Sequence, residues 1–400
     1  MTGPTTVDSL TRAAPSRTAP AVVGAFMFGH FTHHVTNSLL APLLPLIRDS
    51  FALSYAQSGF LVSAFSVSGG LSQAPIGALA DRIGSRTVVT VGLLGSALLC
   101  FLIGLVDAYW QLVVALVGLG IVAGTYHAPA NTLLSQLFPR GRLGGVLGIH
   151  TVGGNLSFFA TPLLAGGLAA ATLTWRTPYL FFAIAPFLAG LFLMFTLPRV
   201  PGREGRPLGT AAMFRELGEV FRAVGPLLGL AILFQMTYAA TFSFIALFLV
   251  DARGFDPATA AFFVSAPFIG GLLGSPLGGA LSDRLGRKPV IIASLVCMGP
   301  ALLLFTSVGP EFIIPALALM GLVSSAKMPV VEGLILERAP AERRATSLGA
   351  YYFVAQEFGG LAAPALGALA GAVGIAQSFG SVAFAAALAS GLILLFARRL

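Results

Sequence analysis

Two stretches, Gly77-Ala-Leu-Ala-Asp81-Arg82-Ile-Gly84-Ser-Arg86 and Gly279-Ala-Leu-Ser-Asp283-Arg284-Leu-Gly286-Arg287-Lys288, repeat one pattern 202 residues apart. The same shift aligns Asp49 with Asp251, Phe60 with Phe262, Ser63 with Ser265 and Gly69 with Gly271. A match of this length indicates an internal repeat. Its glycines allow two helices to turn tightly, its aspartate can cap or pair at a helix end, and its basic residues can stay in water.

The composition excludes an ordinary soluble protein. Of 400 residues, 56% are hydrophobic and only 10% are charged, with a mean hydropathy of +0.90. Soluble chains carry about a quarter charged residues. The two cysteines, Cys100 and Cys297, lie far apart within apolar runs and indicate no disulfide framework. The net charge of +8 comes from basic residues between apolar segments, so it indicates membrane topology and not nucleic-acid binding.

Apolar stretches long enough to cross a bilayer recur along the chain, and twelve of them are predicted. A membrane-spanning helix needs about 20 residues. Strands of about ten alternating residues are absent, and backbone polar groups in lipid must be satisfied internally. We therefore expect an all-α integral membrane protein. The expected spans are centred near His34, Ser66, Ser96, Gly124, Leu156, Pro186, Gln235, Ile269, Val296, Gly321, Glu357 and Ala386.

The basic residues predict the orientation of these spans. Nineteen of the 23 lysines and arginines fall on the side of the N-terminal tail, whereas Arg48, Arg176 and Arg253 fall on the other and Lys327 lies within a span. Positive residues collect on the cytosolic side, so both termini are expected there. We expect a cytosolic tail (1–20), a six-helix bundle (21–198), a cytosolic central loop (199–222) and a second six-helix bundle (223–400).

The duplicated stretch resembles the signature of the major facilitator superfamily, G-x-x-x-D-R-x-G-R-[RK], although Ser85 replaces the usual basic residue in the first copy. The resemblance covers nearly the whole chain. It implies twelve transmembrane helices in two pseudo-symmetric six-helix bundles that rock about a central site and use ion gradients. It also implies a cytosolic latch in which Asp81 and Asp283 contact helix ends across the bundle interface. The latch candidates are Gly77, Asp81, Arg82, Gly84, Arg86, Gly279, Asp283, Arg284, Gly286, Arg287 and Lys288.

Three further segments resemble the fosmidomycin-resistance branch of exporters. They are Gly29-His30-Phe-Thr-His33-His34-Val-Thr-Asn37 with the following Leu43-Leu44-Pro45, Tyr126-His127-Ala-Pro129, and Gly153-Gly154-Asn155 with Pro162. Span four lacks the arginine that many drug/proton antiporters carry, and span one lacks the acidic residue that others use. If protons are the coupling ion, other groups must therefore bind them.

Histidines are the first candidates, because all five lie within predicted spans. An ionisable group at membrane depth is costly and points to function. His30, His33, His34 and Asn37 share one helix face, as do His127, Asn131 and Ser135 on span four. Histidine suits proton coupling because its ordinary pKa is near neutrality. Three interpretations stay open: proton or substrate binding, structural hydrogen bonding, and a metal site at His30, His34 and His127.

The second half contributes charge to the predicted site. Lys327 follows His127 by 200 residues, and each precedes a proline by two, so the repeat predicts matching positions in the two bundles. Glu357 is the preferred partner of Lys327, and Glu332 is a candidate gate or structural ion pair. The remaining candidates for substrate binding or coupling are His150, Asn155, Gln235, Tyr238, Tyr352 and Gln356.

No enzymatic motif is present: the sequence lacks G-x-x-x-x-G-K-[ST], H-E-x-x-H and G-x-S-x-G. We predict a secondary active transporter that exports a small organic solute, anionic or drug-like, by alternating access coupled to protons. The alternatives are a transition-metal transporter built on His30, His33, His34 and His127, and a proton-coupled importer of a small metabolite. We expect no cofactor, a proton gradient as the driving force, a monomer in the bacterial inner membrane, and lipid, solute and protons but no nucleic acid as partners.

Overall fold

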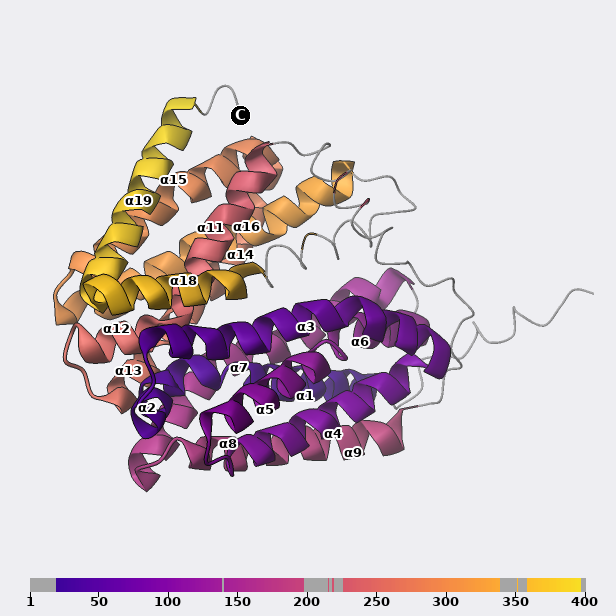
Figure 1. The fold of residues 1–400 in the computed structure, drawn as a ribbon. Helices are drawn as coiled ribbons and strands as arrows, with labels where there is room; N and C mark the ends of the chain where they lie inside the picture. The colour runs from indigo at the N-terminus through magenta and orange to yellow at the C-terminus, as the bar shows by residue number, and fades with distance from the viewer. Residues whose placement is uncertain are drawn as a thin grey trace, which may run out of the picture.

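The structure is a computed structural model that describes residues 19–138, 140–197, 215, 218, 226–338, 351 and 358–396 (Figure 1). Within these ranges the chain is helical and contains no strand. The predicted tail (1–20) and central loop (199–222) lie almost entirely outside the described residues. The boundaries of the four predicted regions therefore stay predictions.

The first half of the chain forms one group of packed helices. α1 packs against α7, α3 packs against α5, and α4 packs against both α5 and α9. The helices are α1 (Ala19–Asn37), α2 (Leu40–Phe51), α3 (Tyr55–Ile83), α4 (Ser85–Ile103), α5 (Tyr109–Ala123), α6 (His127–Leu137), α7 (Arg140–Thr172), α8 (Arg176–Phe182) and α9 (Ile184–Thr196).

The second half forms a similar group. α14 lies along α16, and α15 packs between α16 and α19. The elements are α11 (Pro226–Ser243), α12 (Ile245–Asp251), α13 (Pro257–Phe263), α14 (Ala266–Leu285), α15 (Arg287–Ser307), the 3-10 turn η1 (Pro310–Phe312), α16 (Ile313–Arg338), α18 (Phe358–Val373) and α19 (Ile375–Phe396).

Most of the predicted spans appear as long apolar helices. Among the described residues, eight helices are long and apolar enough to cross a membrane, and a ninth is added if α11 and α12, bent by 47° at Phe244, count as one span. The spans predicted around His34 and Ser66 fall on α1 and α3, and α18 begins next to the predicted centre at Glu357. The chain is therefore a multi-pass membrane protein.

Several predicted spans are two helices with a break. Span one divides after Asn37 into α1 and α2, and span four divides around Gly124 into α5 and α6. Pro129, in the first turn of α6, has no backbone N–H to donate to the carbonyl of Thr125, which interrupts the helix there. A break of this kind turns backbone and side chains toward a site that a straight helix would not line.

The repeat has the same backbone geometry in both halves. Gly84 separates α3 from α4 with φ 92°, and Gly286 separates α14 from α15 with φ 90°. A residue with a Cβ atom rarely adopts such positive φ values. The two glycines of the repeated pattern are therefore needed for the same sharp turn, which confirms the internal repeat.

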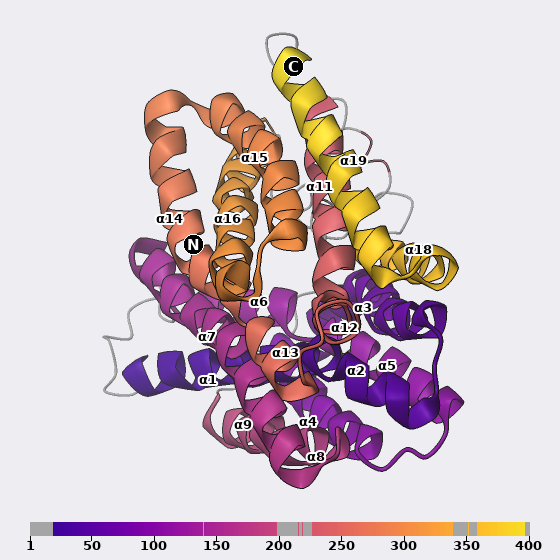
Figure 2. The ribbon, with the colours of Figure 1, turned by 90° about the vertical axis from the view of Figure 1, so that its left-hand side faces the viewer.

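The two groups of helices meet at one end of the molecule and diverge toward the other (Figure 1). α18 lies along the first part of α3, where Gly59 packs against Ala363 and the Ser63 hydroxyl donates to the carbonyl oxygen of Gly360 over 2.5 Å. α12 and α13 lie against α2, and α13 also contacts α7 (Figure 2). We call the joined end the Arg48 end and the opposite one the signature end, after the repeated stretches.

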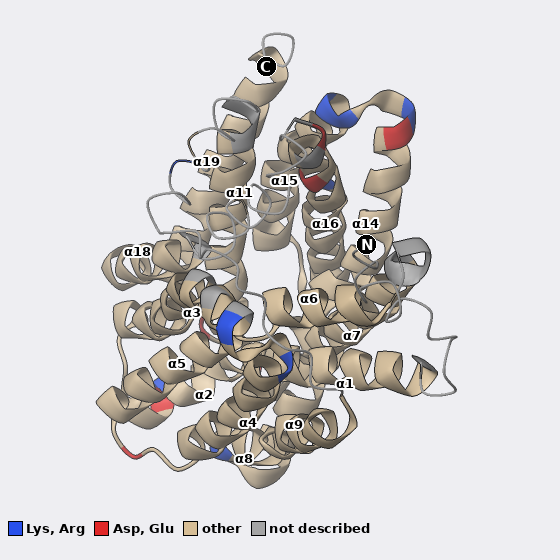
Figure 3. Cartoon of the chain, turned by 90° about the vertical axis from the view of Figure 1, so that its right-hand side faces the viewer, with Lys and Arg blue, Asp and Glu red and all other residues tan. Residues whose placement is uncertain are grey.

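Charged residues gather at helix ends and loops, whereas α9 and α19 contain none (Figure 3). At the Arg48 end, Arg176 donates to the carbonyl of Val106 and Arg253 donates to the carbonyl of Thr306. These bonds satisfy carbonyl groups near helix ends that have no partner within their own helix.

Candidate functional site

Five histidines from three helices come together in the first bundle. His30, His33 and His34 lie on α1, His127 begins α6 and His150 lies on α7. We call these five residues the histidine cluster. α1 and α7 approach closely because α7 has glycines at the contact: a Cβ atom on Gly154 would lie 2.8 Å from Cε1 of His30, and one on Gly153 would overlap the carbonyl oxygen of Met27.

The rings of the cluster contact one another directly. His30 stacks on His150 with ring centroids 4.1 Å apart, and His34 lies 4.7 Å from His30 and 5.1 Å from His127. His33 stacks on Tyr126 at 4.8 Å. His30, His33 and His150 are buried, His34 is half-buried and His127 is exposed. The cluster therefore reaches from the bundle core to an open surface through His127.

Hydrogen bonds order the neutral cluster. Nδ1 of His30 lies 2.8 Å from the carbonyl oxygen of His150, which can only accept, so this nitrogen carries the proton. Nε2 of a neutral His30 is then an acceptor, and Nε2 of His34, 3.0 Å away, donates to it. This leaves Nδ1 of His34 as an acceptor that is buried and has no hydrogen-bond partner in the described part of the chain.

The amide candidates take different positions. Asn37 is half-buried and its Nδ2 donates to Nε2 of His33 over 3.2 Å. Asn131 and Asn155 are exposed. Asn155 precedes Pro162 by seven residues on α7, which places both on one helix face, and Pro162 lines the cavity described next.

A cavity of about 190 Å³ lies between the bundles beside the histidine cluster. Asn37 and Phe158 join the two sites, because both line the cavity while Asn37 bonds His33 and the Phe158 ring lies 4.5 Å from His34. Phe158 of α7 also stacks on Phe268 of α14 with centroids 5.0 Å apart. Side chains from both halves therefore enclose this space.

The sequence did not single out the aromatic residues of the cavity. Phe65, Phe158, Phe242 and Phe268 all line it. The chain contains 32 phenylalanines, so residue type carried no signal. The hydroxyl groups of Ser66 and Ser243 in the lining donate to carbonyl oxygens of their own helices, which leaves the described lining largely apolar.

The second bundle holds a buried lysine. Lys327 of α16 is 1% exposed and its Nζ donates to Oε1 of Gln235 on α11 over 2.5 Å. Tyr238 is half-buried and stacks on Phe242 at 6.0 Å, and Glu332 is half-buried on α16. The predicted partner Glu357 lies outside the described residues, as do Tyr352 and Gln356. The structure thus joins Lys327 to another predicted residue, Gln235.

An ion-pair group that the sequence analysis did not predict ties the bundles together at the Arg48 end. The Arg48 guanidinium on α2 contacts the carboxylate of Asp251 on α12 and also bonds Asp49 at 2.8 Å. The Tyr55 hydroxyl of α3 donates to Asp251 over 2.6 Å. We call Arg48, Asp251 and Tyr55 the outer lock. The sequence held one indication of this group: the repeat aligns Asp49 with Asp251, and the neighbouring Arg48 is one of the few basic residues on that side.

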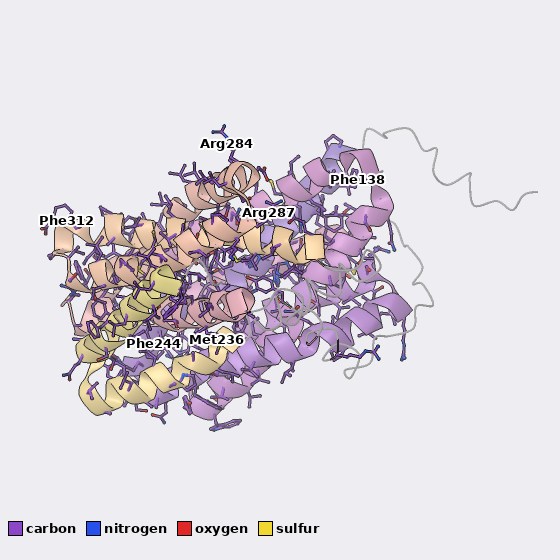
Figure 4. The ribbon with its side chains drawn as sticks, turned by 90° about the horizontal axis from the view of Figure 1, so that it is seen from above. Phe138, Met236, Phe244, Arg284, Arg287 and Phe312 are labelled. Atoms are coloured by element: carbon purple, nitrogen blue, oxygen red, sulfur yellow. The ribbon has the colours of Figure 1, made fainter. Side chains whose placement is uncertain are left out.

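Three of the predicted latch residues, Asp283, Arg287 and Arg86, contact their own bundle in this structure. Arg287 pairs with Asp283 at 3.3 Å and with Glu337 of α16 at 3.0 Å. In Figure 4, Arg284 projects outward from the molecule while Phe138 and Phe312 mark its opposite ends.

In the first half, Arg86 bonds the carbonyl of Met194, Arg82 is exposed, and the side chain of Asp81 is not described. The latch is predicted for the state in which the signature end is closed. That role stays a prediction, because here the bundles diverge at this end.

The fold is found in solved transporter structures. A bacterial homologue of the human lysosomal transporter Spinster, inward-facing and unoccupied, matches with a TM-score of 0.78 at 17% identity over 96% of both chains. A peptide transporter POT in complex with sulfate matches with a TM-score of 0.76 at 15% identity over 94% of both chains.

Sequence relatives are transporters as well. The fosmidomycin resistance protein of Escherichia coli K12 is 24% identical over 364 residues, covering 89% of this chain and 87% of that protein. The multidrug resistance protein MdtG of Proteus mirabilis is 28% identical over 358 residues, covering 86% and 88%. The family model of the major facilitator superfamily matches residues 26–266 and 227–400. The chain therefore belongs to the major facilitator superfamily and is a membrane transporter, not an enzyme.

Proposed function

We propose that the protein exports a small organic solute from the cytosol by alternating access, with protons moving in the opposite direction. The observation that carries the proposal is the cavity between the bundles, which side chains of both halves line and which adjoins the histidine cluster. A carrier needs such a site at the bundle interface, since rocking of the bundles then exposes it to each side in turn.

The state described here corresponds to an inward-open carrier in this proposal. Nineteen of the 23 basic residues favour the signature end as the cytosolic one. The bundles are joined at the Arg48 end by the outer lock and by α18 along α3. Solute would therefore enter the cavity from the cytosol and leave after the outer lock opens. The membrane would be a bacterial inner membrane with both termini in the cytosol.

The histidine cluster is the proposed coupling site in the first bundle. It is linked to the cavity through Asn37 and Phe158. A change of charge in the cluster would alter the cavity wall and so bias the equilibrium between the two states, because a ligand shifts a conformational equilibrium through its different affinities for them. Glu357, outside the described residues, is the proposed coupling group of the second bundle.

The cavity favours a solute with an apolar, aromatic part. Four phenylalanines line it, together with three serine hydroxyl groups that already donate to nearby backbone carbonyl groups. The relatives named for fosmidomycin and multidrug resistance favour a drug-like cargo. Lys327 is 1% exposed and does not line this cavity, so it is the candidate contact for an anionic group on that solute only in another state of the carrier. No cofactor is proposed, and the working unit is a monomer.

Transport in proteoliposomes with an internal pH dye tests the proposal. Under an imposed pH gradient, adding a phosphonate or an aromatic drug should evoke a proton flux in wild type. Phe158→Ala should weaken solute-evoked flux by enlarging the cavity. His34→Gln should abolish proton movement while solute exchange without a gradient persists, because solute binding uses the cavity. The matched control is Phe195→Ala, an exposed residue on α9, which should transport normally.

Two outcomes would contradict the proposal. If solute moves at an unchanged rate with no proton flux, the carrier is not proton-coupled. If solute and protons move in the same direction, the protein is a symporter, and the importer alternative replaces export.

A further inference from the structure

We propose that His30, His34 and His127 form a binding site for a transition-metal ion of the Zn²⁺ class. The inference goes beyond solute export and does not depend on it. Each of the three side chains offers a nitrogen ligand, and these nitrogens all lie within 4.8 Å of one another. Three imidazoles from two helices, α1 and α6, meet at one point beside the cavity.

The distances approach those of a metal site. Zn–N bonds of about 2.0–2.1 Å in tetrahedral geometry place two nitrogen ligands about 3.3 Å apart. Nε2 of His30 and Nε2 of His34 are 3.0 Å apart, so this pair needs only a small expansion. The His127 ring already lies 5.3 Å from that of His30 and 5.1 Å from that of His34, and its ligand nitrogen is within 4.8 Å of theirs.

His30 is oriented as metal-binding histidines usually are. Its Nδ1 donates to the carbonyl oxygen of His150 over 2.8 Å, which leaves the Nε2 lone pair directed at the proposed ion. Such a second hydrogen bond fixes the tautomer and the ring plane of a metal ligand. Gly154 leaves the room for both rings, since a Cβ there would lie within 3.0 Å of His30 and of His34.

His34 has a second ring nitrogen that can take up the proton its Nε2 must lose to bind a metal. Its Nδ1 is buried and makes no hydrogen bond to any described residue. A metal bound at Nε2 displaces the proton that His34 donates to His30, and Nδ1 of His34 is an unoccupied acceptor that can receive this proton.

The donor set selects the class of ion. Neutral imidazoles suit Zn²⁺, Cu²⁺ and Ni²⁺, whereas Mg²⁺ and Ca²⁺ require oxygen ligands. Three protein nitrogens leave a fourth tetrahedral position for water or for a solute atom. His33 does not belong to the set, because its Nε2 accepts the hydrogen bond of Asn37.

Co²⁺ binding to the purified, full-length protein in detergent tests the site, since tetrahedral Co²⁺ absorbs visible light strongly and Zn²⁺ displaces it. We expect an intense visible band in wild type that one equivalent of Zn²⁺ abolishes. His30→Gln, His34→Gln and His127→Gln should each weaken Co²⁺ binding at least tenfold. His33→Gln is the matched control and should bind as wild type, although its ring lies 4.8 Å from that of His127.

Stability measurements separate loss of ligand from loss of fold. His127 is exposed, so His127→Gln should melt at the wild-type temperature without metal and should lose the rise in melting temperature that Zn²⁺ causes in wild type. The proposal is overturned if wild type gives no tetrahedral Co²⁺ band, or if His33→Gln weakens binding as much as His127→Gln. Neither outcome bears on solute export, which is measured without metal.

Discussion

At the scale of single residues, Lys327 is held by one described contact within a membrane-spanning helix. The residue is 1% exposed, and its ammonium group donates to Oε1 of Gln235. A hydrogen bond to a charged group contributes about 1.5–3 kcal/mol, and removing one partner leaves the other buried and unsatisfied. The hydrogen bond between Lys327 and Gln235 therefore stabilises the contact of α16 with α11 more than a bond between two neutral groups would.

A double-mutant cycle on Lys327 and Gln235 should reveal that link. Gln235→Leu should lower the melting temperature in detergent, and Lys327→Met combined with Gln235→Leu should lower it less than the sum of the single changes. The coupling energy should be about 1.5–3 kcal/mol, the size of a charged hydrogen bond. Additive effects would mean that Lys327 depends on another group, such as Glu357.

Asp256 shows how pH acts on a residue outside the membrane. Its carboxylate caps α13 by accepting bonds from the Thr259 hydroxyl at 2.6 Å and from the Ala258 and Thr259 amides at 3.0 Å. The bonds from Thr259, followed by the one from Ala258, lower the pKa of Asp256 below its usual value. The cap is thus fully formed above the unfolded-state pKa, and its contribution is lost as pH falls through the lowered one.

Asp256→Ala should therefore destabilise the protein by about 1 kcal/mol at neutral pH, the usual effect of losing an N-cap. Thermal melting across acidic pH should show this difference shrinking as Asp256 becomes protonated in wild type. Asp256→Asn keeps an acceptor oxygen without a titrating group. Because only wild type loses stability as Asp256 becomes protonated, the difference in stability between wild type and this variant should change as pH falls. A difference that stays constant across pH would reject the assignment.

At the scale of elements, the contact of α3 with α18 depends on glycine. A Cβ atom on Gly367 would overlap the carbonyl oxygen of Tyr55, and one on Gly360 would overlap the Ser66 hydroxyl. Gly371 lies on the same helix with open space around its Cβ position. Close helix approach in membranes relies on such small residues.

Gly367→Ala should push α3 and α18 apart at the Arg48 end and so reduce the population closed there, whereas Gly371→Ala should not. Overpacking of this kind costs about 1–3 kcal/mol, enough to change a two-state population severalfold. Spin-label distances between the ends of α3 and α18 measure the effect. Equal distances in both variants would show that this contact does not control closure.

The sequence predicted the elements better than their contacts. The repeated glycines and the hydropathy pattern predicted the spans and the sharp turns at Gly84 and Gly286, which depend on local backbone geometry. The helix face of His30, His33 and His34 predicted one side of the histidine cluster. The meeting of His150 with His30, and the selection of Phe158 and Phe268 from 32 phenylalanines, depend on tertiary packing between distant helices, which periodicity does not encode.

At the scale of the whole molecule, the outer lock joins the two bundles at the Arg48 end. Asp251 receives bonds from Arg48 and from Tyr55, both in the first half, so one carboxylate joins three elements. Asp49 bonds the same arginine from its own helix and is far more exposed, with 59% of its side chain accessible against 17% for Asp251. Of these two aspartates, only Asp251 bonds a residue of the other bundle.

Asp251→Asn should shift the carrier toward the state open at the Arg48 end, whereas Asp49→Asn should leave the equilibrium unchanged. Labelling of a cysteine introduced at Ser66, in a Cys297→Ser background, by an impermeant reagent added from the Arg48 side should rise severalfold in the first variant only. Exchanging the charges, Arg48→Asp with Asp251→Arg, should restore wild-type labelling. Equal labelling of both asparagine variants would remove the lock from the gating mechanism.

The outer lock also has an electrical consequence. Arg48 and Asp251 face each other from opposite bundles at one end of the molecule, so opening that end separates them sideways, in the plane of the membrane. Membrane voltage acts on displacement along the membrane normal, at about 2.3 kcal/mol per elementary charge per 100 mV. Breaking the lock therefore moves almost no gating charge. The membrane potential would drive the transport cycle only through charge carried by solute and protons.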